Sequence, residues 1–268
     1  MRGRLAIECG RRLGHGVVAS TVAALRSIRG LVLPPVCSFC EVDLADSETP
    51  DRTVHDRLCD PCRTTLAQEQ LHRCPKCAAA VAPTFQGPDC PWCRKHDLRF
   101  DRAVTLGTYR AELRDAVIRL KHAGEEALST ALALMNWERN GATVGQVGAD
   151  LVVPVPMHWW RRAVQGHNGP DLAAAFWAGR LRVDDHPRLL VRSRRTKPQA
   201  GLTPPERRKN VHNAFTIRRG YRVAGARVLL VDDILTTGAT CSEAARTLKR
   251  AGAKSVMVVV TGRAQEET

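Results

Sequence analysis

Runs of consecutive apolar residues alternate with helical patterns through the second half of the chain. Four apolar runs predict strands, at 103–106, 151–156, 228–231 and 255–260. Helices are predicted between them, on the face marked by Leu113, Val117 and Leu120, at 170–181, and after the third run up to 251. Since the third run has no polar alternation, it is expected to be buried on both faces of a parallel sheet. Strands alternating with helices indicate an α/β domain with a parallel sheet flanked by helices.

The first 34 residues give a weaker pattern. No run of about 18 uninterrupted apolar residues exists, so no membrane span is expected. The closest stretch, 17–33, is interrupted by Arg26 and Arg29 and is interpreted as an amphipathic or flexible segment. A signal peptide is the alternative. The cysteine pattern described below favours a reducing, cytoplasmic location instead.

The third apolar run leads directly into two adjacent carboxylates, Asp232 and Asp233. Ligands of open α/β sheets bind outside the carboxyl ends of the strands, which is where these acids are expected. The loop 236–240 follows at once, with three threonine hydroxyls and with Gly238, which permits a turn that a Cβ would obstruct. N–H groups at the start of the next helix can receive a phosphate. An ordinary strand, turn and capped helix is the alternative.

Residues 228–240, VLLVDDILTTGAT, resemble the 5-phosphoribosyl-1-pyrophosphate (PRPP) signature of type I phosphoribosyltransferases. The resemblance implies that Asp232 and Asp233 hold the ribose 2′- and 3′-hydroxyls and influence the Mg²⁺ that bridges hydroxyls and pyrophosphate. It implies a 5′-phosphate cradle made of Thr236, Thr237, Gly238, Ala239 and Thr240. Carboxylates accept hydrogen bonds from hydroxyls and attract hydrated Mg²⁺ but repel phosphate, which agrees with a loop that carries no acid.

Eight of the ten cysteines form four Cys-x-x-Cys pairs between 37 and 93. This spacing predicts two structural Cys₄ zinc sites, because two intervening residues let both thiolates of a knuckle face one ion. Pairing consecutive knuckles groups Cys37 and Cys40 with Cys59 and Cys62, and Cys74 and Cys77 with Cys90 and Cys93. An interleaved arrangement is the alternative, and iron–sulfur or redox chemistry is a further one. Cys241, after the phosphate loop, is interpreted as a small buried hydrophobe.

Most of the positive charge lies in one segment. Residues 188–222 contain eleven lysines and arginines against one acid, Glu206, and supply +10 of the chain's net +14. We interpret this segment as an anion-binding hood that excludes water from pyrophosphate, with a solvated surface as the alternative. The candidate pyrophosphate or hood residues are Lys121, Arg161, Arg162, Arg195, Lys197 and Arg207.

Further motifs narrow the resemblance. The cysteine pairs, 109–121, Val-Pro-Val-Pro at 153–156, and Arg195-Thr-x-x-Gln199-x-x-Leu202 together resemble the ComF family over about 35–262. That family implies a type I phosphoribosyltransferase fold with an N-terminal double zinc ribbon and an association with bacterial competence, the uptake of single-stranded DNA. The expected division is 1–34, a zinc-ribbon module at 35–98, and a phosphoribosyltransferase domain at 99–268.

One loop departs from the family pattern. Family members usually show Arg-Gly-Phe-Asn-Gln where this chain has Gln-Gly-His-Asn-Gly at 165–169. The usual arginine and glutamine are therefore missing, and Arg161 and Arg162 are the candidates to substitute for them.

Two functions follow from these patterns. The first is an enzyme that binds Mg²⁺·PRPP and transfers the phosphoribosyl group to a nitrogen acceptor with release of pyrophosphate. The second is a non-catalytic competence factor that binds single-stranded DNA and uses the PRPP site as a sensor. Expected partners are PRPP, with single-stranded DNA and competence-machinery proteins in addition.

Overall fold

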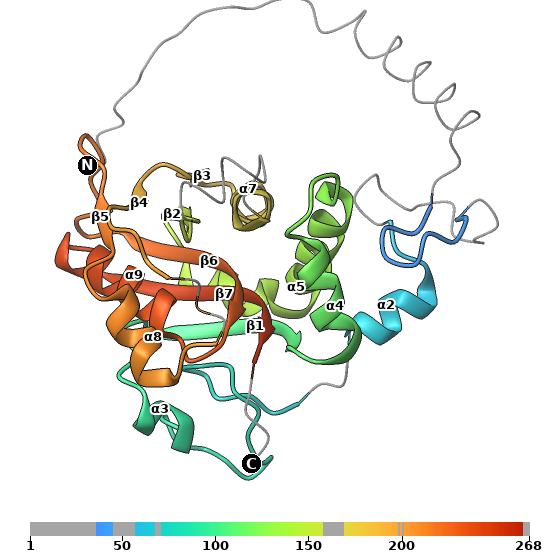
Figure 1. Cartoon of the computed structure of the whole chain (residues 1–268), viewed down its shortest axis with the longest axis horizontal. Coiled ribbons are helices and arrows are strands. Elements are labelled where there is room, and N and C mark those ends of the chain that lie inside the picture. Colours follow the sequence, from blue (N-terminus) through green and yellow to red (C-terminus); the bar gives the residue numbers. More distant parts are fainter. Residues whose placement is uncertain are drawn as a thin grey trace, which may run out of the picture.

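A five-stranded parallel sheet forms the centre of the molecule (Figure 1). The computed structural model describes residues 36–44, 57–67, 71–157, 169–197, 199 and 201–264. The strand order is β1-β7-β6-β2-β3, with β1 at Arg102–Thr108, β2 at Leu151–Pro154, β3 at Asp184–Asp185, β6 at Arg227–Leu235 and β7 at Ser255–Arg263. The predicted parallel sheet is confirmed. No helix among the described residues is long and apolar enough to cross a membrane.

The two faces of the sheet are covered by different elements. Helices α5 (Glu126–Val147) and α7 (Gly169–Leu181) pack on one face, where Leu229 and Val231 join their cluster. Helix α9 (Ala239–Arg250) packs on the other, where Val228 and Leu230 are buried with the second cysteine group. All four residues of the apolar run are buried, as expected for a strand covered on both sides.

The two cysteine-bearing segments occupy different places on the domain and join different hydrophobic clusters (Figure 1). Helix α2 (Asp60–Ala67) shares a hydrophobic cluster with α4 (Ala111–Arg119) and α5, which contains Leu66, Leu113 and Leu128. The segment with the short helix α3 (Pro91–Lys95) packs instead under β6, β7 and α9. Each cysteine group therefore packs against apolar residues of the α/β domain.

The basic segment has a regular framework. Strands β4 (Leu190–Arg192) and β5 (Phe215–Ile217) form an antiparallel pair, and α8 (Pro204–Val211) lies between them in sequence and packs on α9. Thr203 and Glu206 form a capping box at the start of α8. Several cations of the segment serve this framework: Arg192 lies over the Phe215 ring, and Arg194 donates to the carbonyls of Asn210 and His212.

Helix α5 was not predicted from the sequence. Its central part is buried on most sides, from Leu128 to Asn136, so polar and apolar positions do not alternate with a clear helical period. Asn136 is buried because its amide donates to the backbone oxygen of Val260 at 2.9 Å. Strands also differ in length from the prediction, since β6 continues to Leu235 and β7 to Arg263.

Candidate functional site

Asp232 and Asp233 lie in the C-terminal half of β6, within the strand rather than just after it. Asp232 is paired in register with Val260 of β7, and the strand continues through Ile234 and Leu235. The acids therefore stand at the carboxyl edge of the sheet, where parallel strands present ligands to a crevice.

The carboxylate of Asp232 is held by two donors. Its Oδ1 accepts from the backbone N–H of Asp233 at 2.9 Å, and its Oδ2 accepts from the thiol of Cys241 at 3.3 Å. Burial raises the pKa of Asp232 well above its ordinary value, and the neighbouring charge of Asp233 raises it further. Asp233 Oδ1 accepts from the N–H of Ile234 at 2.7 Å. Because two adjacent carboxylates repel each other, they are suited to bind a cation or hydroxyl donors.

The loop that follows is shaped by Gly238, which has a φ of 78° and is the N-cap of α9. A Cβ at this position would lie 2.8 Å from Cδ2 of Leu98. Only glycine adopts this conformation readily, so the tight approach of Leu98 and the positive φ both account for it. The loop thereby places the first N–H groups of a twelve-residue helix beside the acids.

One residue of the basic segment reaches this loop. Nε2 of Gln199 donates to Oγ1 of Thr240 at 3.3 Å. By contrast, the side chains of Arg195 and Lys197 are exposed, while Arg207 is half-buried and donates to the carbonyl of Leu202. The segment therefore meets the loop 236–240 through an amide, while Arg195 and Lys197 face solvent.

The remaining candidates are only partly placed. Lys121 is exposed just beyond the end of α4. Arg161, Arg162 and residues 165–168 lie outside the described residues, as does the segment 1–34. Gly169 begins α7 and lies near Leu120, so α7 starts close to the end of α4.

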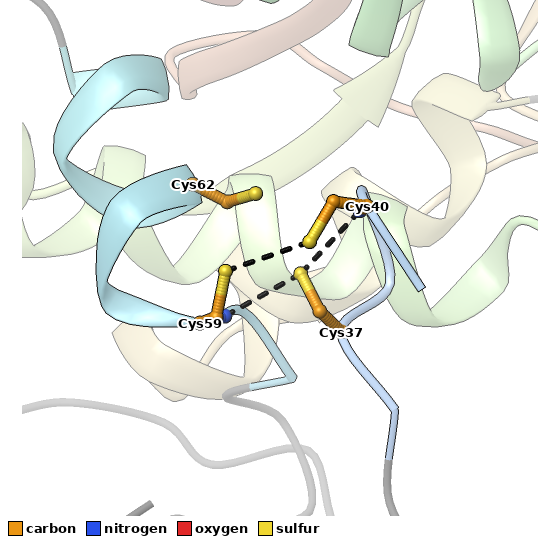
Figure 2. Close-up of side chains that lie close together, drawn as sticks. All are labelled: Cys37, Cys40, Cys59 and Cys62. Carbon is orange, nitrogen blue, oxygen red and sulfur yellow. Dashed lines mark hydrogen bonds between the residues drawn. The ribbon is translucent and has the colours of Figure 1, made fainter. Parts of the chain in front are cut away.

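The eight paired cysteines form two groups with the expected composition. Cys37, Cys40, Cys59 and Cys62 make one, and Figure 2 shows their sulfur atoms converging from two facing segments. Cys74, Cys77, Cys90 and Cys93 make the other. The alternative interleaved pairing is not what the fold adopts. The second group is buried throughout, whereas Cys40 of the first is exposed.

The geometry of both groups fits a tetrahedral zinc ion. The Sγ atoms of Cys40 and Cys59 are 3.6 Å apart, as are those of Cys74 and Cys93. A zinc–sulfur bond of about 2.3 Å gives tetrahedral edges of about 3.8 Å, whereas a disulfide brings sulfurs to about 2 Å. Backbone N–H groups of Cys40 and Cys59 also point at Sγ of Cys37, as in metal knuckles.

The pKa values of the cysteines shift in opposite directions within these groups. Burial raises the pKa of Cys37, but N–H donors from Cys40, Cys59 and Phe39 outweigh it and bring the pKa to about 6. In the second group, burial raises the pKa of Cys77 to about 11. Burial and then the neighbouring thiolates raise that of Cys93 further. Four thiolates repel one another unless a cation neutralises them, so the donor set suits a divalent metal.

Three contributors to the site were missed or undervalued from sequence. Cys241 packs as the buried residue that was expected, but its thiol also orients Asp232. Gln199 appeared only as part of a family motif. Arg263 was not singled out, because an arginine closing an apolar strand looks like an ordinary strand end. Its contacts are described below.

Comparisons with known proteins agree with this architecture. Residues 174–268 match the model of the phosphoribosyl transferase domain. The DNA utilization protein YhgH of Escherichia coli is 29% identical over 232 residues, covering 85% of this chain and 96% of that protein. Competence protein F of Haemophilus influenzae is 27% identical over 75% of this chain and 88% of its own length. The chain is similar to these DNA utilization and competence proteins over most of its length.

A third relative is also a competence protein. Competence protein ComFC of Bacillus subtilis is 27% identical over 81% of this chain and 90% of that protein. Among solved structures, a glutamine PRPP amidotransferase from B. subtilis superposes with a TM-score of 0.33 and 19% identity over 54% of this chain and 30% of that one. That likeness is too partial to bear on function. This chain thus has a phosphoribosyltransferase-like domain and two Cys₄ groups.

Proposed function

We propose that this protein binds Mg²⁺·PRPP and transfers its phosphoribosyl group to a nitrogen nucleophile. The observation that carries the proposal is the junction of β6 and α9, where Asp232 and Asp233 are followed by the loop 236–240 and a helix N-terminus. The acids would receive the ribose hydroxyls and Mg²⁺, and the loop would receive the 5′-phosphate. The bond between C1 and the pyrophosphate oxygen breaks, a bond from C1 to nitrogen forms, and the nucleophile loses a proton.

Positioning and charge supply the rate in this proposal. Pyrophosphate bound to Mg²⁺ and to cations is a good leaving group, so little acid–base chemistry is required. The basic segment 188–222 is the source of these cations, with Lys121, Arg161 and Arg162 as further candidates. Its contact between Gln199 and Thr240 supports a position over the phosphate loop.

The test measures Mg²⁺·PRPP binding by calorimetry and pyrophosphate release with a panel of nitrogen nucleophiles. Asp232→Asn and Asp233→Asn are expected to lose binding at least about tenfold, since each removes a charged acceptor. Asp150→Asn is the matched control. Asp150 pairs with Arg227 at the opposite end of β6, so its loss affects a partly exposed ion pair and leaves PRPP binding unchanged.

The possible results separate the parts of the proposal. Binding without release for any nucleophile leaves a PRPP-binding protein and removes the transferase. Equal affinity in wild type and in both strand variants removes the PRPP site. An effect of Asp150→Asn as large as that of Asp232→Asn would reveal general destabilisation instead of a site.

A second function, binding of single-stranded DNA with PRPP as a sensed ligand, is favoured by a basic groove. The groove has a volume of about 620 Å³ and runs along α9 between α8 and the residues that follow α3. Five arginines and lysines line it against two acids; the cations are Arg99, Arg208, Arg246, Lys249 and Arg250. The names of the relatives, a DNA utilization protein and two competence proteins, support the same function.

This function is tested by fluorescence anisotropy with labelled single-stranded oligonucleotides at several salt concentrations. Affinity is expected to fall steeply as salt rises, because phosphate contacts release counterions. Arg208→Ala/Arg250→Ala is expected to weaken DNA binding. It should also reduce the slope of log affinity against log salt concentration by about two, one for each lost phosphate contact. No binding at low salt eliminates the DNA function, and an unchanged double variant eliminates the groove.

A further inference from the structure

The guanidinium of Arg263, the last residue of β7, is fully buried between the second cysteine group and the phosphate loop. On one side its Nε donates to the backbone oxygen of Cys77 at 2.9 Å. On the other side its Nη1 donates to the backbone oxygens of Leu235 at 2.8 Å and Thr236 at 2.6 Å, and also to that of Ala264. One rigid side chain thus joins two elements that are distant in sequence.

The buried charge of Arg263 has no carboxylate partner among the described residues. Its Nη2 is buried and has no hydrogen-bond acceptor in the described part of the chain, and the Trp92 ring lies 4.8 Å below the guanidinium. A buried cation is costly unless an opposite charge lies near. A zinc ion with four thiolates carries a net charge of about −2, so the loaded second group supplies that opposite charge.

The same group also forms the floor of the loop. Leu98, a few residues after Cys93, leaves no room for a Cβ on Gly238. Oγ of Ser242, in the first turn of α9, accepts from the N–H of Arg99 and donates to the backbone oxygen of Asp97. Leu235 and Thr236, the carbonyls that Arg263 holds, are the last strand residue and the first loop residue. The loop 236–240 is therefore held in place by contacts with the segment that carries the second cysteine group.

We propose that Arg263 couples metal binding in the second Cys₄ group to the phosphate loop, so that each favours the other. With metal bound, the group holds the guanidinium in place and the guanidinium holds the entrance of the loop. Loss of the metal removes the compensating negative charge and leaves an uncompensated cation beneath the loop, which then loosens. The inference rests on the proposed PRPP site, and coupling of two sites is reciprocal, so PRPP must also retain the metal.

The first Cys₄ group provides an internal control. Arg119 is its counterpart of Arg263, because it donates to the carbonyls of Ser38 and Phe39 and lies over the Phe39 ring. Its other partners are Glu125 and Glu41, and within the described part of the chain its hydrogen bonds and ion pairs do not reach the loop 236–240. Arg119 therefore serves one group without a link to the phosphate site.

The first experiment follows zinc release to a chromogenic chelator, with and without Mg²⁺·PRPP. The first group, in which Cys40 is exposed, is expected to release its ion rapidly at a rate that PRPP does not change. The buried second group is expected to release slowly, and PRPP is expected to slow it further by about fivefold or more. Arg263→Lys keeps the charge but cannot bridge both sides, so the PRPP effect is expected to vanish, whereas Arg119→Lys retains it.

The second experiment needs no PRPP. Amide hydrogen exchange in peptides covering 235–240 is compared in wild type, Arg263→Met, Arg119→Met and Cys90→Ser/Cys93→Ser. Exchange in these peptides is expected to be about tenfold faster or more in Arg263→Met and in Cys90→Ser/Cys93→Ser, because charged hydrogen bonds to the loop are lost. It is expected to be unchanged in Arg119→Met. Protection of β6 and the zinc content of the first group report whether each variant is folded.

The outcomes are distinguishable. Failure of wild type to bind PRPP removes the proposed function, while hydrogen exchange still decides the coupling. A folded Arg263→Met protein whose loop exchanges like wild type overturns the proposal. The proposal is also overturned if PRPP slows zinc release from both groups equally. If Cys90→Ser/Cys93→Ser unfolds the sheet, Arg263→Lys and Arg263→Met carry the decision.

Discussion

The thiol of Cys241 lies 3.3 Å from Oδ2 of Asp232 and donates to it from the first turn of α9. Burial raises the pKa of Cys241 well above its ordinary value, and the charge of Asp232 raises it further, so the side chain remains a thiol donor. The helix that follows the phosphate loop thus also orients the acid that precedes it. A residue that sequence alone presents as filler links the two halves of the site.

Replacing Cys241 separates this donor role from its packing. Cys241→Ala removes the donor and is expected to weaken Mg²⁺·PRPP binding by about 2–10-fold, the effect of one hydrogen bond. Cys241→Ser retains a donor and is expected to bind nearly as wild type. Calorimetry measures both. Equal affinities for all three proteins would limit Cys241 to packing.

Binding is expected to depend on pH through Asp232. Its raised pKa keeps the carboxyl protonated above the usual aspartate range of about 4, whereas Mg²⁺ and ribose hydroxyls require the ionised form. Affinity should therefore fall as pH falls through the raised pKa, and binding should release protons. Calorimetry in buffers of different ionisation enthalpy detects this release, which Asp232→Asn should abolish.

The same pKa gives stability the opposite dependence. A raised folded pKa contributes stability below the unfolded pKa, and that contribution is lost as pH rises through the folded pKa. Asp232→Asn is therefore expected to stabilise the ligand-free protein relative to wild type at pH 8 and to make little difference near pH 4. Urea unfolding at the two pH values measures it. A constant difference would contradict the shifted pKa.

Gly238 is expected to tolerate no side chain. Gly238→Ala places a Cβ in the left-handed region and 2.8 Å from Leu98, at a cost of about 1–2 kcal/mol from conformation alone. Lower urea stability and weaker PRPP binding should both result. Gly145→Ala is the control, because this exposed position in α5 has open space for a Cβ and should gain roughly 0.5–1 kcal/mol. A neutral Gly238→Ala would show that the loop relaxes easily.

The two cysteine groups should differ in their effect on the sheet. Cys37→Ser/Cys40→Ser is expected to lose one zinc per chain and to loosen α2, with PRPP affinity within about twofold of wild type, since distant sites act independently. Cys74→Ser/Cys77→Ser opens a cluster that includes Leu230 and Val258, so a lower Tm of the whole domain is expected. Metal analysis measures the zinc content and calorimetry measures the PRPP affinity and the Tm of both double variants. An equal fall in Tm in the two variants would contradict the expected difference between the groups.

The local part of the site was predictable from sequence. Residues 228–231 form a strand because four successive apolar residues are stable only when both faces are covered, and the acids and Gly238 follow within one short stretch. The grouping of cysteines was equally predictable. Two knuckles close together in the chain meet at small entropic cost, so nearest neighbours combine.

Only the tertiary structure decided what surrounds these motifs. Helix α5 escaped prediction because it is buried on most sides, and burial on all sides erases the period that marks a helix. Leu98 against Gly238, and Arg263 between Cys77 and Thr236, join residues far apart in sequence. Such contacts depend on how strands and loops pack in space, which no local pattern encodes. The sequence by itself therefore determined the acid-and-threonine motif and the grouping of the cysteines, and the fold decided that Arg263 joins the two.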